Sequence, residues 1–158
     1  MPQRCIDTTL FDLFKVGPGP SSSHTIGPMK AGHHFAETCA ALPRDLLVRA
    51  VRFRVRLYGS LSATGTGHGT DAAVVAGLLG TAPESCPAGL LQELMDDPHT
   101  RRKRSLGDGQ VSVCVDDVSH DAIIHDFPYS NTLVADLLDA EDKVLHSQEY
   151  YSVGGGFI

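Results

Sequence analysis

The chain has 158 residues, 42% of them hydrophobic, so it is long enough for one domain with its own core and too short for two of ordinary size. Its formal net charge of -6 argues against nucleic acid as the main partner, because binding phosphates needs a basic surface. No apolar run approaches the roughly 18 residues of a membrane span, and the N-terminus lacks a charged and then apolar leader. We therefore expect a one-domain cytoplasmic protein.

The first half of the chain has mainly helical patterns. The hydrophobic segment 11–16 predicts a short strand or a packed turn. From Ile26 to Leu42 small and apolar residues recur at near-helical spacing, which predicts a helix that Pro43 ends. Two further helices are expected over 70–79 and 87–95. These helices precede most of the strand patterns.

One strand interrupts this helical half, over Val51 to Tyr58. Its apolar residues alternate with Arg52, Arg54 and Arg56, the period-two pattern of a half-buried strand. The arginines form a charged stripe on the other face. Such a stripe could contact an acidic partner, although solvent exposure is the expectation we adopt.

Strand patterns dominate the second half. Val111, Val113 and Val115 alternate, and residues 122–127 form another apolar run. Residues 132–138 and 144–153 flank a turn at 140–143, which predicts a hairpin. Helices early and strands late indicate an α+β domain, a mostly antiparallel sheet with helices on one face.

The basic run Arg101 to Arg104 lies between Pro98 and the turn at 107–109. This placement predicts a solvated loop rather than a recognition patch.

The four cysteines, Cys5, Cys39, Cys86 and Cys114, are far apart and form no C-x-x-C pair. We expect free thiols, mostly buried, in a reducing compartment. No metal site built from this chain alone is expected.

The most informative motif is the stretch Thr64-Gly65-Thr66-Gly67-His68-Gly69-Thr70-Asp71. The glycines beside His68 leave its imidazole little shielded, and histidine suits proton transfer near neutral pH. The stretch leads into an expected helix N-terminus, which attracts anions, with Thr70 or Asp71 as the cap. One interpretation is a small carboxylate or phosphate beside His68. The other is a surface loop with a solvated histidine.

The glycine stretch does not match the two common nucleotide-binding motifs. A P-loop needs a lysine, and none occurs between Lys30 and Lys103. The spacing of Gly65, Gly67 and Gly69 also departs from the dinucleotide fingerprint.

A second loop of similar character precedes the first long helix, with the sequence Gly17-Pro18-Gly19-Pro20-Ser21-Ser22-Ser23-His24-Thr25. Its hydroxyls exceed what one helix cap uses, and Pro28 fits the first helical turn. The spare donors suit an oxyanion. The alternative is an over-supplied cap after a stiff turn.

Five separated motifs, in order along residues 1–158, closely resemble the β domain of iron-sulfur-dependent L-serine dehydratases. They are Leu10-Phe11-Asp12-Leu13-Phe14-Lys15, the run from Gly17 to Met29, Leu57-Tyr58-Gly59-Ser60-Leu61, Gly67-His68-Gly69-Thr70-Asp71, and the run from Tyr150 to Phe157. Matching five motifs in order makes the resemblance specific.

The resemblance implies a lyase of amino-acid catabolism that converts L-serine to pyruvate and ammonia. In that family the β domain is joined to, or bound by, an α domain whose cysteines hold a four-iron four-sulfur (4Fe-4S) cluster, and we expect a homodimer. The open iron would act as a Lewis acid on the serine hydroxyl, and the imidazole matching His68 would take the α-proton as general base. The residues expected near the substrate carboxylate, or shaping the cavity, are Ser21, Ser22, Ser23, His24, Thr25 and Thr70.

Two departures from the family pattern matter. Thr66 stands where many relatives carry lysine, which removes a positive charge beside the expected anion site. None of the four cysteines matches the cluster-ligating pattern. The chain alone is therefore not expected to hold the cluster or to turn over serine.

Two other functions remain open. The fold type is similar to the allosteric substrate-binding domains of phosphoglycerate dehydrogenases, which suggests a module that senses a small anion and carries no catalytic residue. A pure dimerisation domain is the third possibility. The final Gly154-Gly155-Gly156-Phe157-Ile158 suggests a hinge whose continuation is absent, or a natural terminus docked in a groove.

Overall fold

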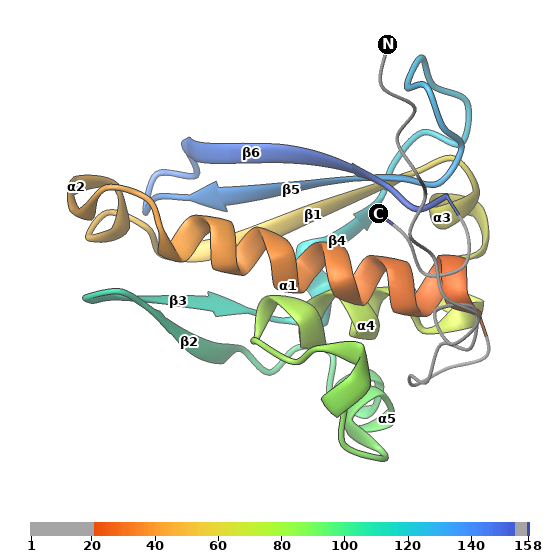
Figure 1. Ribbon diagram of the computed structural model, residues 1–158, viewed down its shortest axis with the longest axis horizontal. Coiled ribbons are helices and arrows are strands. Elements are labelled where there is room, and N and C mark those ends of the chain that lie inside the picture. The colour runs from red at the N-terminus through yellow and green to blue at the C-terminus, as the bar shows by residue number, and fades with distance from the viewer. Residues whose placement is uncertain (1–20, 154–157) are drawn as a thin grey trace, which may run out of the picture.

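The protein is described by a computed structural model over residues 21–153 and 158. Its strands form one six-stranded sheet in the order β2-β3-β1-β5-β6, with β4 paired to β1 off this path (Figure 1). The strands are β1 (Arg52–Tyr58), β2 (Arg102–Leu106), β3 (Gly109–Val113), β4 (Val118–His120), β5 (Thr132–Leu138) and β6 (Val144–Tyr151). β1 pairs in parallel with β3 and β4, and the other pairings are antiparallel.

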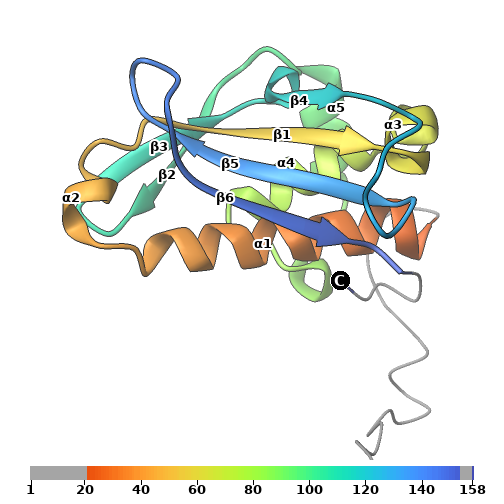
Figure 2. The same cartoon turned by 90° about the horizontal axis from the view of Figure 1, so that it is seen from above.

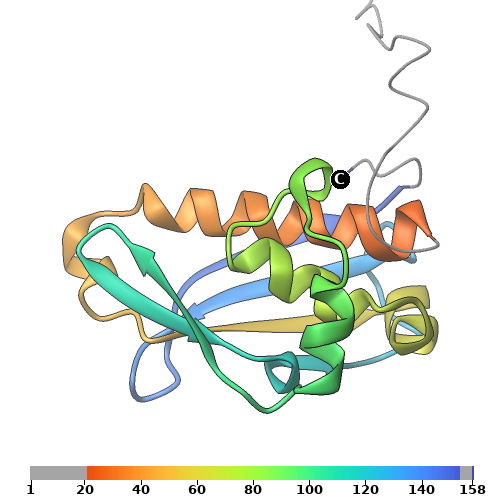
Figure 3. The same cartoon turned by 90° about the horizontal axis from the view of Figure 1, so that it is seen from below.

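Helices cover one face of this sheet. Figure 2 shows strands β1, β5 and β6 from the open side, and Figure 3 shows α1 and α4 in front of the sheet from the opposite side. The α-helices are α1 (Gly27–Ala40), α2 (Arg44–Leu47), α3 (Ser60–Thr64), α4 (Thr70–Leu78) and α5 (Leu90–Asp96), and the short π or 3-10 turns are η2 (Ser22–Ile26), η3 (Thr66–His68), η4 (Pro83–Ser85) and η5 (Val115–Asp117). The predicted α+β class, with a mostly antiparallel sheet, is confirmed.

The long predicted elements are also confirmed. Helix α1 contains Pro28 in its first turn and ends before Pro43, because proline cannot continue the helical hydrogen bonding. Strand β1 alternates between half-buried and fully buried positions, as the period-two pattern requires. The β5–β6 hairpin closes through the turn that follows Asp139.

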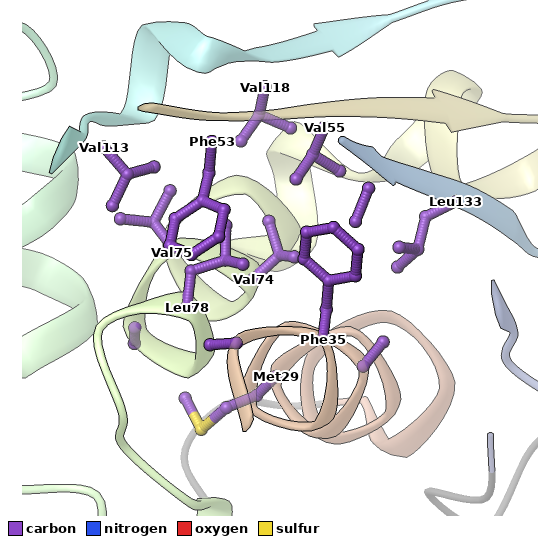
Figure 4. Packing of buried hydrophobic residues seen from close by; sticks show 14 of the residues in the cluster. Met29, Phe35, Phe53, Val55, Val74, Val75, Leu78, Val113, Val118 and Leu133 are labelled. Atoms are coloured by element: carbon purple, nitrogen blue, oxygen red, sulfur yellow. The ribbon is translucent and has the colours of Figure 1, made fainter. Parts of the chain in front are cut away.

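The core lies between α1, α4 and the sheet. Phe35 of α1 meets Phe53 of β1 edge to face, with ring centroids 5.9 Å apart. Val74, Val75 and Leu78 of α4 belong to the same buried cluster and pack near these two rings (Figure 4). Every residue of α4 is buried, so this helix has no solvent face and is held by packing on all sides.

Helices α1 and α4 touch backbone to backbone because glycines stand at their contact. A Cβ atom added at Gly77 would overlap the backbone carbonyl oxygen of Met29 in α1. One added at Gly32 would overlap the carbonyl oxygen of Val74 in α4. The two glycines thus fix the distance at which the helices pack.

The arginine stripe of β1 is not simply solvated. Asp136 on β5 is fully buried and accepts hydrogen bonds from Arg54 at 2.7 and 3.0 Å and from Arg56 at 3.1 Å. Ser147 of β6 also donates to this carboxylate, at 2.6 Å. The expectation of solvent exposure is wrong because a cross-strand carboxylate draws the guanidinium groups onto the sheet, where both side chains are only 33% exposed.

The basic run after Pro98 is a second correction. Arg102 to Leu106 form strand β2, paired antiparallel with β3, rather than a solvated loop. Arg102 pairs with Glu93 at 3.1 Å and Arg104 with Glu37 at 2.5 Å. Acidic partners from other elements offset the charges, so the run can pair as an edge strand.

The apolar run over 122–127 is a third correction, because it forms no strand. Ile123 is 62% exposed and Ile124 is 93% exposed. His125 and Phe127 instead contact Tyr58, at ring centroid distances of 6.0 and 4.9 Å. Residues 121–131 are therefore an irregular loop anchored by its aromatic residues.

The described residues test several other expectations only in part. Cys39, Cys86 and Cys114 are free; two of them are buried, and burial raises the pKa of the Cys39 thiol to about 12. Within residues 21–153 no helix has the length and apolar character to cross a bilayer. Cys5, the segment 11–16 and the terminal glycines lie outside the described residues.

Replacing Gly77 by alanine should destabilise the fold, because the new methyl group forces α1 and α4 apart. Overpacking of this kind costs about 1–3 kcal/mol of unfolding free energy, measurable by chemical denaturation. Gly67→Ala is the matched control, since a Cβ atom there meets nothing within 4 Å. Equal stability of the two variants would contradict the close helix contact.

Candidate functional site

The candidate site lies at one end of the sheet, on the right in Figure 1, where three strand ends meet. In the strand register, Tyr58 at the end of β1 faces Thr132 at the start of β5, which faces Tyr151 at the end of β6. The residues just beyond these ends are Ser60, Asn131 and Ser152. Antiparallel pairing thus brings three polar segments that are distant in sequence to the same end of the sheet.

The serine-rich segment lies at this end, at the start of α1. Ser21 caps the turn η2, and its hydroxyl accepts from the backbone N–H of His24 at 3.4 Å. Helical structure therefore begins at Ser22, earlier than the predicted start near Ile26. Ser152 donates to the backbone carbonyl of Ser23 at 2.7 Å, which ties this segment to the end of β6.

The glycine stretch forms the short turn η3 between α3 and α4. Gly69 adopts the left-handed conformation, with φ 68°, and this lets the chain turn from His68 directly into α4. The prediction that Thr70 or Asp71 caps this helix is wrong. Gly69 is the N-cap residue, no side chain caps the helix, and both predicted residues lie inside its first turn.

Two buried threonines join the serine-rich segment to the glycine stretch reciprocally. The hydroxyl of Thr25 donates to the carbonyl oxygen of His68 at 3.0 Å. The hydroxyl of Thr70 donates to the carbonyl oxygen of His24. Both side chains are fully buried, so these bonds are shielded from water. The structure therefore gives Thr25 and Thr70 a bracing role, and their predicted contact with substrate stays a prediction.

This brace places two imidazoles side by side. The ring centroids of His24 and His68 lie 5.0 Å apart, with the rings tilted by 51°. His24 is held on both sides by hydroxyls, with Nδ1 2.8 Å from Ser23 Oγ and Nε2 3.1 Å from Ser60 Oγ. His68 Nδ1 is buried and has no hydrogen-bond partner within residues 21–153 and 158. Both ring nitrogens of His24 have a hydroxyl partner, whereas Nδ1 of His68 has none among the described residues.

The two histidines differ electrostatically. Burial lowers the pKa of His24 below its ordinary value of 6.5, and the nearby His68 lowers it further, against a smaller opposing effect from Ser60. His24 is therefore neutral at pH 7. A neutral imidazole both donates and accepts, which matches its two hydroxyl partners.

A cavity of about 430 Å³ adjoins the serine-rich segment. Its lining residues are Ser23, Tyr129, Ser130, Asn131, Ser152 and Val153. Among the site residues predicted from sequence, Ser23 alone lines this cavity. Its size suits a small polar molecule, and most of its lining side chains carry hydroxyl or amide groups.

Sequence reasoning missed Ser60, Ser130, Asn131 and Ser152 as members of this end of the molecule. Each stands just beyond a strand, and the predicted hairpin contained the signal needed to find two of them. An antiparallel pair places the residues before one strand beside the residues after the other. Asn131 and Ser152 follow this rule, and the backbone N–H of Ser152 donates to the carbonyl of Asn131 at 2.9 Å.

The described residues do not fit an iron-sulfur cluster. Cluster binding needs several cysteine thiolates close together, but Cys39 and Cys114 are buried in separate elements and their burial raises the pKa of both thiols. Within the described part of the chain, no group of three or more histidine, cysteine or acidic side chains could hold a metal ion.

The fold and the site together define an α+β domain that presents a histidine pair and several hydroxyl groups at one end of its sheet. Comparison with known proteins shows which class this is. A family model described as the serine dehydratase beta chain matches residues 9–158, so the chain belongs to that family.

Curated relatives agree with this assignment. The chain is 41% identical over 156 residues to L-serine dehydratase 2 of Escherichia coli, and 40% identical over 155 residues to the L-serine dehydratase of Streptomyces coelicolor. It is 35% identical over 153 residues to the L-serine dehydratase of Helicobacter pylori. Each alignment covers 95% of this chain but only about a third of the relative, 33%, 33% and 32% respectively.

Replacing His68 by glutamine should raise the pKa of His24 toward its ordinary value of 6.5. The nearby imidazole is one of the two causes that lower this pKa, and burial remains, so the rise is partial. Histidine titration followed by NMR measures it. His99→Gln, at an exposed position on another part of the surface, is the control. An unchanged His24 pKa in the His68 variant would contradict the electrostatic coupling of the two rings.

Proposed function

We propose that the chain is the β domain of an L-serine ammonia-lyase, which converts L-serine to pyruvate and ammonia. Membership of the serine dehydratase beta chain family supports the reaction class. The observation that carries the site assignment is the His68 ring, which lies beside His24 and has a buried, unpartnered Nδ1. The domain would supply the general base and part of the substrate cavity.

In this proposal His68 takes the α-proton of serine. A general base needs an available lone pair, and a neutral imidazole carries one on the ring nitrogen without a hydrogen. The carbonyl oxygen of His68 is held by Thr25, which fixes the backbone from which the ring projects. His24 is neutral and hydrogen-bonded on both ring nitrogens, so it suits the orientation of neighbouring hydroxyls better than proton abstraction.

The substrate carboxylate would lie near the serine-rich segment. Helices α1 and α4 both begin at this end of the molecule, and the threonine bonds join η2, which precedes α1, to η3 and to the start of α4. The N-terminus of a helix favours an anion by about 0.3–1 kcal/mol. The hydroxyls of Ser21, Ser22 and Ser23 are half-buried and add donors there.

The 4Fe-4S cluster implied by the family likeness would belong to a part of the enzyme outside this chain. The described residues do not fit a cluster, and the curated relatives are about three times as long as the matched region. We therefore assign this chain proton transfer and carboxylate binding only. The isolated chain should be inactive. A cytoplasmic location and a homodimer stay predictions.

The loop 121–131 is the proposed contact with that cluster-bearing partner. It is anchored beside the site, since Gly59 donates to the carbonyl of Ala122 at 3.0 Å and Ser62 to that of Asp121 at 2.7 Å. Ile123 and Ile124 project from it at 62% and 93% exposure. Adjacent exposed isoleucines next to a site that needs a second component are suited to docking it.

Replacing His68 by alanine should lower kcat of the assembled enzyme by about 10²-fold or more, because the proton acceptor is removed. Steady-state pyruvate formation measures this. His99→Ala is the control, since that side chain is 81% exposed. Calorimetry of serine and phosphate binding to the wild type and to the His68 variant tests the alternative function of a sensing module. Near-normal turnover in the His68 variant would refute the base assignment, and tight anion binding unaffected by the change would favour a sensing module.

Replacing both Ile123 and Ile124 by serine should weaken association with the cluster-bearing partner about tenfold or more, because each buried isoleucine contributes about 1.5–3 kcal/mol. Dissociation constants for the two parts, expressed as separate chains, measure this. Val48→Ser, a change at a 60% exposed position near α2, should leave association unchanged. Equal affinity of all variants would place the docking surface elsewhere.

A further inference from the structure

His120, at the end of β4, joins three elements around the glycine stretch. Its Nδ1 lies 2.9 Å from the backbone carbonyl oxygen of Ser62 in α3. Its Nε2 lies 3.0 and 3.1 Å from the two carboxylate oxygens of Asp71 in α4. The hydroxyl of Thr66 in η3 lies 3.3 Å from the same Nε2. No motif in the sequence singled out this residue.

The hydrogen-bond partners of His120 determine its protons. A carbonyl oxygen only accepts, so Nδ1 must carry a hydrogen. An ionised carboxylate also only accepts, so Nε2 must carry one too. The arrangement is satisfied by an imidazolium paired with the Asp71 carboxylate. The pair is partly shielded, with the His120 and Asp71 side chains 29% and 11% exposed.

The surroundings favour this cation. Burial alone lowers the pKa of His120, but the bonds to Asp71 and Ser62 and the charges of Asp71 and Asp121 outweigh it, so the pKa lies above the ordinary 6.5. Asp71 approaches from α4, and Asp121 follows His120 in the chain. The neighbours from α3 and β1, the Ser62 carbonyl and Leu57, are uncharged. The titratable group of η3 itself is His68.

We propose that His120 is a positioning residue for the candidate site, where the His120–Asp71 pair holds the turn η3 in the conformation that presents His68. The catalytic part of this inference rests on the proposed function. Thr66 begins the turn and Asp71 follows it, so the pair clamps the turn on both sides of His68. Neither residue needs to touch the substrate for this role.

The clamp has a defined pH dependence. A raised folded-state pKa means that the stabilisation is fully present below the ordinary pKa and is lost as pH rises through the folded value. Above that value Ser62 keeps the hydrogen on Nδ1, and the lone pair of Nε2 then faces the Asp71 carboxylate. The contact becomes repulsive, and the turn loosens.

Two variants separate the clamp from general stability. His120→Gln removes the cation. Asp71→Asn keeps a hydrogen-bonded pair with neutral His120, because the amide N–H can donate to Nε2, and it removes the high-pH repulsion. His99→Gln is the matched control, since His99 forms an exposed ion pair with Asp116 in another part of the molecule.

The test combines backbone amide exchange of residues 66–69 in the 158-residue chain with pH profiles of kcat in the assembled enzyme. We expect His120→Gln to speed exchange about tenfold and to lower kcat about tenfold, as loss of a charge-assisted hydrogen bond would. KM should change less. In the wild type, the exchange rate relative to the intrinsic rate of an unstructured chain at the same pH should rise as His120 loses its proton, and Asp71→Asn should abolish that step. His99→Gln should match the wild type.

Unchanged exchange and kcat in His120→Gln would overturn the proposal, as would a wild-type turn whose exchange ignores the titration of His120. If His120→Gln fails to fold, the pH step and its loss in Asp71→Asn still decide the matter. Amide exchange reports on the clamp even if His68→Ala proves active. Failure of the proposed function and failure of the clamp are therefore distinguishable.

Discussion

The candidate site depends on two reciprocal hydrogen bonds between the first turns of two helical segments. Thr25 holds the carbonyl of His68, and Thr70 holds the carbonyl of His24. Thr25 lies one residue after His24, and Thr70 lies two residues after His68. Each segment therefore holds the backbone of the other beside its histidine. Because both threonines are fully buried, water does not compete for these bonds. The proximity of the two imidazoles is thus a property of the backbone rather than of flexible side chains.

This brace requires helices α1 and α4 to approach closely, and the core provides that condition. Gly32 and Gly77 remove the side chains that would separate the two helices. Phe35, Val74 and the apolar face of β1 then pack around the contact (Figure 4). A site built on packed helix ends keeps its geometry better than one carried by loops. The glycine-rich site turn is therefore supported by the packed helices on which it stands.

Sequence patterns predicted the elements whose burial is periodic. They failed where contacts with side chains from other elements determine the local structure. The alternation in β1 and the β5–β6 hairpin follow directly from period two. Strand β2 was missed because its basic side chains are matched by acidic residues distant in sequence, and the exposed Ile123 and Ile124 follow no periodic rule. The motifs brought His68 and the serine-rich segment into one hypothesis, and the structure places His68 beside His24. The motifs could not predict the hydrogen bonds between His120 and the glycine stretch. His120 reaches that stretch only because β4 pairs with β1 in the folded protein.

The charges around the candidate site bear on the proposed need for a second component. The segments Ser21–Ile26 and Thr64–Asp71 contain neither lysine nor arginine, and His24 is neutral because burial and His68 lower its pKa. The cation held by His120 faces the Asp71 carboxylate, so the pair adds little net charge. The starts of α1 and α4 add positive potential, at about 0.3–1 kcal/mol each. That is enough to orient a small carboxylate but too little to bind it tightly, since a micromolar ligand needs about 8 kcal/mol. In the proposed function this composition makes a weak anion receptor, and most of the substrate affinity would come from groups outside this chain.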